Sequence, residues 1–171
     1  MRDHHIHICL FQPEIPQNAG SIGRLAAATH CRLHMIRPFG FSTSDRNLRR
    51  AGLDYWPFLD LEIHDSLDEL LERFSGRFAF FSKFAAKTYD TMPDTTELLI
   101  FGQETKGLPP WVHAKYARQL FGIPMFHQGV RSINLANAVA ITTYHQLARR
   151  GCFAGALTPP SYPIMANKGP E

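Results

Sequence analysis

Three polar segments of this sequence contain side chains that could bind a ligand or take part in catalysis. The first contains Asn18 and Arg24, the second contains Glu104, and the third contains Ser132 and Asn134. Amides and hydroxyls donate and accept hydrogen bonds, a carboxylate accepts them, and a guanidinium stays protonated while offering five donors. Such groups can orient a polar substrate and stabilise negative charge that develops on it. They can do so only if the fold brings three distant segments together.

Each polar segment follows a short apolar run of the kind that forms a buried strand. Ile6–Phe11 precedes the first segment, Leu98–Phe101 the second and Leu120–Pro124 the third. Similar runs elsewhere in the chain are Leu33–Ile36, Leu61–His64 and Phe78–Phe81. Apolar runs that alternate with helices predict an α/β fold with a mostly parallel sheet flanked by helices. Because ligands bind at the carboxyl ends of strands in such sheets, the segments are expected to meet in one crevice.

The segment after the first strand predicts a loop, Gln12–Asn18, and then a helix over about Ala19–Thr29. Gly20 and Gly23 lie inside this helix, where each costs about 1 kcal/mol relative to alanine. Another part of the molecule is therefore expected to approach this backbone closely. Arg24 lies one turn after Gly20, and helical side chains lean toward the helix N-terminus, so its guanidinium should reach back toward the loop.

The third polar segment opens a longer helix with two apolar sides. Leu135 and Val139 share one face, Ile141 and Tyr144 share another, and charged residues return only from Arg149 onward. A helix without a water-facing side must be covered twice. Its own sheet is one cover, and a second subunit is the simplest other, so we predict a homodimer.

Ser132 and Asn134 stand where this last helix begins. The free N–H groups of a helix N-terminus can hold a ligand, and polar side chains at this position could help to bind it. Either side chain could equally serve only to cap the helix. Both interpretations remain open from the residues alone.

A basic segment, Ser44–Arg50, predicts a short helix that could contact nucleic-acid phosphates. Its cations are Arg46, Arg49 and Arg50, and the aromatic pair Tyr55–Trp56 follows closely. Basic residues on a helix more often form a solvated face, and such aromatic pairs more often belong to a core than stack on unpaired bases. Both alternatives stay open for each feature.

The composition indicates one soluble domain. With 171 residues, 44% of them hydrophobic, we predict a single domain over residues 1–155 and a Pro- and Gly-rich tail over residues 156–171. A net charge of +3 permits a nucleic-acid partner without requiring one. Three widely spaced cysteines, no signal peptide and no apolar run of about 18 residues predict a cytoplasmic protein that does not enter a membrane.

Several familiar sites do not fit the sequence. Gly20–Gly23 lacks the three-glycine fingerprint of a dinucleotide fold, and Gly102–Gly107 lacks the Lys-Ser or Lys-Thr ending of a phosphate-binding loop. No Gly-x-Ser-x-Gly elbow is present. His5, His7 and Cys9 would form one row on a strand without a second cluster of ligands, so no metal is predicted.

Taken together, the three polar segments resemble the motifs of the SPOUT superfamily of RNA methyltransferases. Pro13–Arg24 resembles the first motif, Ile100–Leu108 the second, and Ile123–Met125 with Arg131–Ala138 the third. The resemblance covers nearly the whole chain. A further segment, Arg49–Tyr55, is similar to the bacterial tRNA wobble-position 2'-O-methyltransferases, which act on cytidine or uridine.

The resemblance implies a deep trefoil knot in the C-terminal part of the chain, with S-adenosylmethionine bound in it. The cofactor pocket would be lined by backbone near Phe80, Gly102, Ile123 and Ser132. The catalytic group would consist of Arg24 at its centre, supported by Asn18, Glu104, Ser132 and Asn134. The same resemblance implies a homodimer and a tRNA substrate.

The implied reaction transfers a methyl group to the ribose 2'-hydroxyl of the wobble nucleotide, a cytidine or modified uridine, in the tRNA anticodon loop. Methylation of another tRNA or rRNA position and a catalytically silent RNA-binding protein are the alternatives. Because a guanidinium is effectively always protonated, Arg24 is expected to be an electrostatic clamp on the ribose rather than a base. A phosphate or Glu104 could accept the proton.

Overall fold

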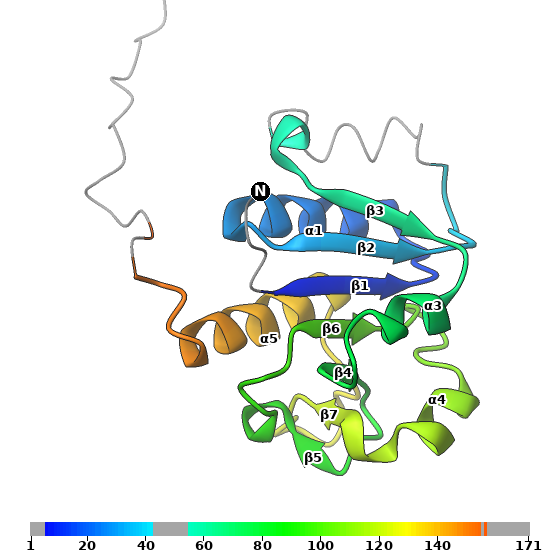
Figure 1. Ribbon diagram of the computed structural model, residues 1–171. Helices are drawn as coiled ribbons and strands as arrows, with labels where there is room; N and C mark the ends of the chain where they lie inside the picture. The colour runs from blue at the N-terminus through cyan, green and yellow to red at the C-terminus, as the bar shows by residue number, and fades with distance from the viewer. Residues whose placement is uncertain (1–5, 43–54, 155, 157–171) are drawn as a thin grey trace, which may run out of the picture.

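The computed structural model describes residues 6–42, 55–154 and 156, and a parallel sheet forms its centre (Figure 1). The strands are β1 (His7–Phe11), β2 (Arg32–Ile36), β3 (Leu61–His64), β4 (Phe78–Phe81), β5 (Lys87–Thr88), β6 (Leu98–Phe101) and β7 (Leu120–Gly122). Their order across the sheet is β3-β2-β1-β6-β4-β7-β5, and neighbouring strands pair in parallel. The predicted parallel α/β fold is confirmed. The carboxyl ends of β1, β6, β4 and β7 therefore lie next to one another along one edge.

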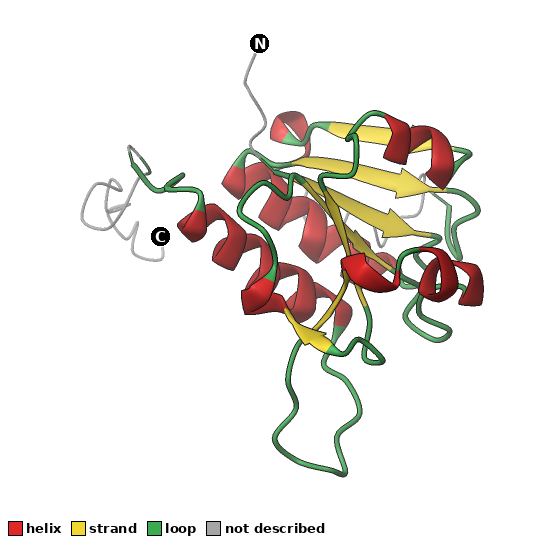
Figure 2. Ribbon diagram, turned by 60° about the horizontal axis from the view of Figure 1, so that its bottom comes forward, coloured by secondary structure: helices red, strands yellow, loops and turns green. Residues whose placement is uncertain are grey.

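Helices cover both faces of the sheet, and short 3-10 turns connect some of the elements. The helices are α1 (Pro16–Thr29), α3 (Leu67–Glu72), α4 (Pro110–Lys115) and α5 (Leu135–Arg149), and the turns are η1 (Trp56–Phe58), η2 (Tyr89–Thr91) and η3 (Ala117–Gln119). α1 and α5 lie side by side on one face, whereas α3 and α4 pack against the other (Figure 2). One apolar core forms on each side of the sheet.

The two middle strands, β4 and β6, are buried on both faces. Phe81 stacks on Phe101 with ring centroids 4.7 Å apart on the side covered by α1 and α5. Phe80 stacks on Tyr116 at 5.1 Å on the opposite side. Truncation of a buried phenylalanine lowers protein stability by about 3–5 kcal/mol. The packing of these rings therefore stabilises the carboxyl ends of the two strands.

α1 begins at Pro16, three residues before the helix start expected at Ala19. Proline suits the first helical turn because its φ is already helical and its missing N–H would have no partner there. The sequence pattern instead places Pro16 in the loop Gln12–Asn18. Ile15, which precedes the helix, has no polar side chain to cap it. The N–H groups of the first turn must therefore find acceptors elsewhere in the fold.

Asn134 caps α5. Its side-chain oxygen accepts hydrogen bonds from the backbone N–H groups of Ala136 at 2.8 Å and Asn137 at 3.4 Å. Asn134 is therefore the helix cap, as one of the two interpretations expected, and its possible part in a site stays a prediction. This arrangement fixes the direction in which the chain enters the helix from the third polar segment.

One side of α5 is buried and another is partly exposed. The buried Gln146 donates hydrogen bonds of 2.9–3.2 Å from its side-chain nitrogen to the carbonyls of Pro93, Asp94 and Thr96. The other side exposes 39% of Ile141 and 47% of Tyr144. The described chain thus supplies one of the two covers that the sequence predicted, and the second remains a prediction.

A row of histidines crosses three strands on the side of the sheet that α3 covers. Nδ1 of His7 lies 2.8 Å from Nε2 of His34, and Nδ1 of His34 lies 2.9 Å from Nε2 of His64. His34 is fully buried, and desolvation lowers its pKa to about 2. Its ring is therefore neutral at physiological pH.

The strands expected at Leu61–His64, Phe78–Phe81 and Leu98–Phe101 are confirmed residue for residue. β5 and α4 were not predicted, because strands of two residues and helices of six give almost no periodic signal. The helix expected over Ser44–Arg50 lies outside the described residues, as does the tail from residue 157. Among the helices that the structure describes, none is both long and apolar enough to cross a bilayer.

Candidate active site

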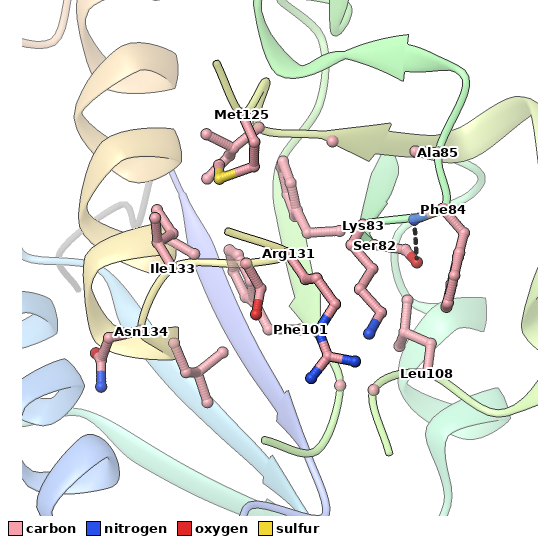
Figure 3. Close-up of a pocket in the computed structure, with 18 of the residues that line it drawn as sticks. Ser82, Lys83, Phe84, Ala85, Phe101, Leu108, Met125, Arg131, Ile133 and Asn134 are labelled. Atoms are coloured by element: carbon pink, nitrogen blue, oxygen red, sulfur yellow. Dashed lines mark hydrogen bonds between the residues drawn. The ribbon is translucent and has the colours of Figure 1, made fainter. Parts of the chain in front are cut away.

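A pocket of about 790 Å³ lies at the carboxyl ends of β4, β6 and β7. Its walls include residues 82–85, 101–108, 121–128 and 130–135, which belong to the strand ends and to the loops that follow them. Figure 3 shows Met125 and Ile133 on the α5 side of this pocket and Phe84 and Leu108 on the opposite side. This pocket is the crevice expected at the ends of the parallel strands.

Hydrogen bonds join the three polar segments at one end of the pocket. The side-chain nitrogen of Asn18 donates to Oε1 of Glu104 at 3.1 Å, and that of Asn134 donates to Oδ1 of Asn18 at 3.0 Å. Asn18 is only 7% exposed, so its amide is fixed between the other two side chains. The structure therefore brings together residues that are separated by 86 and 116 positions in the chain.

Glu104 also provides the cap that α1 lacks. Its Oε2 accepts from the backbone N–H of Glu14 at 2.8 Å, and its Oε1 accepts from that of Ile15 at 3.2 Å. A carboxylate at this end of a helix also interacts favourably with the helix dipole. Because both oxygens already accept hydrogen bonds, the geometry favours a positioning role for Glu104 over that of a free proton acceptor.

Glu14 and Thr105 form a second link between the same two loops. The hydroxyl of Thr105 donates to Oε2 of Glu14 at 2.7 Å, and the backbone N–H of Thr105 donates to the same oxygen at 2.9 Å. These hydrogen bonds, led by the one from the hydroxyl, lower the pKa of Glu14. Each loop thus contributes a carboxylate that binds N–H groups of the other.

The loop after β6 closes on itself between Gly102 and Gly107. The backbone N–H of Gln103 donates to the carbonyl of Gly107 at 3.1 Å, and the N–H of Gly107 donates to the carbonyl of Gln103 at 2.8 Å. A Cβ atom at position 102 would overlap the backbone of Gly107 and Leu108. Glycine is therefore required at Gly102, because only glycine lets the two ends of this pocket-lining loop pack together.

The pocket combines apolar surface with positive charge. The apolar side chains are Phe81, Phe101, Leu108, Met125 and Ile133. Lys83 and Arg131 both extend into the pocket (Figure 3), and the ammonium of Lys83 lies 5.0 Å from the ring centroid of Phe84. Such a surface suits a ligand with a planar apolar part and an anionic group.

The predicted cofactor residues fall into two groups. Gly102, Ile123 and Ser132 line the pocket. Phe80 is fully buried on the opposite side of the sheet, where it packs against Tyr116. Side chains alternate along a strand, so it is the next residue, Phe81, that faces the pocket at this strand end.

Arg24 lines a second cavity, of about 490 Å³, beside the first. Asn18 and Asn134 belong to the walls of both cavities. The guanidinium carbon of Arg24 lies 5.2 Å from the ring centroid of Tyr55, whose hydroxyl donates to the carbonyl of Gly20 at 2.5 Å. The aromatic ring therefore both supports the cation and makes the close approach to α1 that the glycines predicted.

Sequence reasoning missed several residues that build this region. Lys83 and Phe84 follow β4, a parallel strand whose carboxyl end lies between those of β6 and β7. Because a strand was expected at Phe78–Phe81, the rule that ligands bind at the carboxyl ends of parallel strands could have identified this fourth loop. Thr105 and Tyr55 are different, because their partners lie 91 and 35 positions away and no local pattern reports such contacts. The predicted RNA-binding residues, Arg46, Arg49 and Arg50, lie outside the described residues.

Comparison with known proteins gives this geometry a context. The model of the SpoU rRNA Methylase family matches residues 5–144, which is most of the chain. The chain belongs to this family. A tRNA (cytidine(34)-2'-O)-methyltransferase from Polaromonas sp. is 40% identical over 168 residues, covering 95% of this chain and 99% of the relative.

A Bacillus subtilis relative has the same enzyme name, with a prefix that marks the name as provisional. It is 44% identical over 151 residues, which cover 85% of this chain and 93% of the relative's length. Among solved structures, one described as "Structural insights into the 2-OH methylation of C/U34 on tRNA" is 44% identical, with a TM-score of 0.78. It covers 87% of this chain and 97% of its own. The family match and the structural likeness thus extend across all three polar segments.

The two cavities present different chemical groups. The larger one offers apolar and backbone groups for binding, whereas the smaller one presents a guanidinium that remains charged at any physiological pH. The hydrogen-bonded pair of Asn18 and Asn134 fixes the relative position of these two surfaces. The arrangement can hold two molecules beside each other and stabilise negative charge on one of them.

Proposed function

We propose that this protein transfers a methyl group from S-adenosylmethionine to the ribose 2'-hydroxyl of the wobble nucleotide in tRNA anticodon loops. Membership of the SpoU family and the close relatives named for this activity support the proposal. The observation that carries it is the shared wall between the two cavities. Asn18 and Asn134 border both the larger pocket and the cavity that contains Arg24.

The residues of the larger pocket fit S-adenosylmethionine. Its volume of about 790 Å³ is within the range of small-molecule sites, about 300–1,000 Å³. Phe81, Leu108 and Ile133 offer apolar contacts to a purine, and Gly102 lets the backbone of Gly107 and Leu108 pack closely against it, which shapes this wall of the pocket. Arg131 offers a charged donor to a carboxylate. When bound, the cofactor supplies an electrophilic methyl group on sulfur.

In the proposed reaction, Arg24 orients the ribose and stabilises negative charge as the 2'-hydroxyl loses its proton. The face of Tyr55 holds the guanidinium in place, and its fixed position means that little reorganisation is needed during the reaction. Asn18, anchored by Glu104 and Asn134, keeps the two reactants in register.

The proton acceptor that we favour is a phosphate oxygen of the RNA. Both oxygens of Glu104 are occupied by the hydrogen bonds of Glu14, Ile15 and Asn18. A guanidinium cannot act as a base at physiological pH. Ser132, which lines the larger pocket, is proposed to contact the cofactor and to support catalysis from there.

We further propose the trefoil knot, the homodimer and the cytoplasmic location that the sequence led us to expect. The knot is proposed from the family match, and the hydrogen bonds from Gln146 hold α5 against the segment between β5 and β6. The exposed Ile141 and Tyr144 support a second copy as the missing cover of α5. The molecular mass in solution tests the homodimer.

The proposed function is tested with purified protein, S-adenosylmethionine labelled in its methyl group, and tRNA. A matched substrate carries a 2'-deoxynucleotide at position 34, the position named for the relatives, and so lacks only the target oxygen. The proposal expects label in the normal tRNA at that ribose and none in the deoxy substrate. Label on a base, on another nucleotide or on rRNA would contradict it, and so would no incorporation at all.

A further inference from the structure

The row of histidines ends in a cluster of three potential metal ligands near the β3 edge of the sheet, outside the walls of both cavities. One nitrogen of His34, one nitrogen of His64 and one oxygen of Glu62 lie within 4.8 Å of one another. Nδ1 of His34 is 2.9 Å from Nε2 of His64 and 3.6 Å from Oε2 of Glu62. Nε2 of His64 is 3.9 Å from Oε1 of Glu62.

We propose that His34, His64 and Glu62 bind a divalent transition-metal ion, for which Zn²⁺ is the best match. Zinc binds imidazole nitrogen and carboxylate oxygen at about 2.0–2.2 Å, so two ligands of a tetrahedral ion lie about 3.4 Å apart. The two separations that involve Nδ1 of His34, 2.9 Å to Nε2 of His64 and 3.6 Å to Oε2 of Glu62, lie on either side of this value, and all three ligand atoms lie within 4.8 Å of one another. Two imidazoles and one carboxylate are also a donor set that zinc uses in proteins.

The surroundings of His34 resemble the support that metal-bound histidines need. If its Nε2–H donates to Nδ1 of His7, its Nδ1 lone pair points toward His64 and Glu62. A hydrogen bond from the second ring nitrogen is the usual way to fix the tautomer of a ligand histidine. Phe74 packs edge-on against both His7 and His34, with ring centroids 4.9 and 6.3 Å away, and limits rotation of both rings.

The two oxygens of Glu62 differ in their hydrogen bonding. Its Oε1 accepts a hydrogen bond from Arg73 at 2.7 Å. Its Oε2 is buried and accepts no hydrogen bond from the residues that the structure describes. A buried carboxylate oxygen without a donor is costly. Coordination of a cation by Oε2 would remove this cost without displacing Arg73.

Two arginines oppose a cation at this site and must weaken its binding. Arg73 contacts Glu62, and Nη1 of Arg32 lies 3.6 Å from Oε2 of the same carboxylate. Arg32 is largely neutralised by Asp60, to which it donates hydrogen bonds of 3.0 and 2.9 Å. The site should therefore bind Zn²⁺ with lower affinity than a cysteine-rich structural site. The partial exposure of His64 and Glu62 allows water to complete the coordination.

This cluster changes the conclusion drawn from the sequence, where His5, His7 and Cys9 lacked a second group of ligands. The second group comes from neighbouring strands. Register pairs His34 with Glu62, and His64 lies two residues further along β3. His7 then supports the site rather than binding the ion.

The test is Zn²⁺ binding by the full chain without a histidine tag, measured by isothermal titration calorimetry and by thermal unfolding with Zn²⁺ or with a chelator. Glu62→Gln and His64→Gln remove one ligand each. Because these residues are partly exposed, both variants should fold, and unfolding in chelator checks this. His30→Asn is the matched control, since it removes an exposed imidazole at a left-handed position that asparagine tolerates. His4→Gln with His5→Gln controls for the N-terminal histidines.

The proposal expects one Zn²⁺ per chain and a melting temperature that rises with Zn²⁺. It also expects a loss of affinity of at least about tenfold in each ligand variant, with wild-type binding in both controls. Absence of saturable binding by the wild-type chain would overturn it. Unchanged binding by both ligand variants would overturn it as well, and so would loss of binding in the N-terminal double variant, which would assign the ion to that segment.

Discussion

Glu104→Gln tests whether this carboxylate holds the first two polar segments together. Glutamine preserves the size of the side chain and can place its oxygen where Oε1 now accepts from Ile15 and Asn18. Its NH₂ group would then face the backbone N–H of Glu14, which now donates to Oε2 at 2.8 Å. The hydrogen bond from Glu14 is thus lost, because two N–H donors face each other there. The hydrogen bonds from Ile15 and Asn18 remain, but their acceptor is no longer charged.

The cost can be estimated from these contacts. A hydrogen bond to a charged group contributes about 1.5–3 kcal/mol, and a neutral one about 0.5–1.5 kcal/mol. Because the site is partly exposed, the lower ends apply, which gives about 1.5 kcal/mol for the lost bond and about 1 kcal/mol for each bond whose acceptor loses its charge. The total is about 3.5 kcal/mol, equivalent to a fall of about 7–14 °C in melting temperature for a chain of this size.

Thermal unfolding followed by circular dichroism measures the effect on stability, and equilibrium titration with S-adenosylmethionine measures the effect on binding. Affinity should fall as well, since residues 101–108 form one wall of the pocket. Glu72→Gln, which neutralises an exposed carboxylate on α3, is the matched control. The reasoning is refuted if Glu104→Gln unfolds at the same temperature as this control and binds the cofactor as the wild type does.

Further predictions concern the two loops and the basic segment. Gly102→Ala should lower cofactor affinity by at least about tenfold, because its Cβ would push the Gly107 backbone away, and titration would show this. The lowered pKa of Glu14 means that its bond with Thr105 stabilises the fold at neutral pH and is lost as the carboxylate becomes protonated. The stability difference between wild type and Thr105→Val should therefore shrink as pH falls below 4.5, the ordinary value for this carboxyl, and a constant difference would contradict it. If Arg49 contacts a phosphate, Arg49→Gln should reduce the slope of log affinity for tRNA against log salt by about one, as binding titrations at several salt concentrations would show.

Much of the fold could be predicted because its central strands, β4 and β6, are buried on both faces. Continuous apolar runs such as Phe78–Phe81 and Leu98–Phe101 have one stable place, the middle of a covered parallel sheet. Since parallel strands all end at one edge, the convergence of Asn18, Glu104 and Asn134 followed from topology. Sequence periodicity could go this far without contact information.

The details that depend on long-range partners could not be predicted in the same way. Glu104 caps α1 because Ile15 cannot, and the two positions are 89 residues apart. Phe81, rather than Phe80, faces the pocket because of the strand's orientation, which an all-apolar sequence does not reveal. Tyr55 reaches Arg24 from a segment with no periodic signal of its own.

The most direct test of the central claim, that Arg24 stabilises the reacting ribose beside the cofactor pocket, compares wild type with Arg24→Lys. Single-turnover methyl transfer is measured at saturating cofactor and tRNA, together with cofactor affinity. Lysine keeps the charge but loses the planar guanidinium, so transfer should fall by about 10²–10³-fold while affinity for S-adenosylmethionine stays the same. Methyl transfer at the wild-type rate by Arg24→Lys would contradict the account.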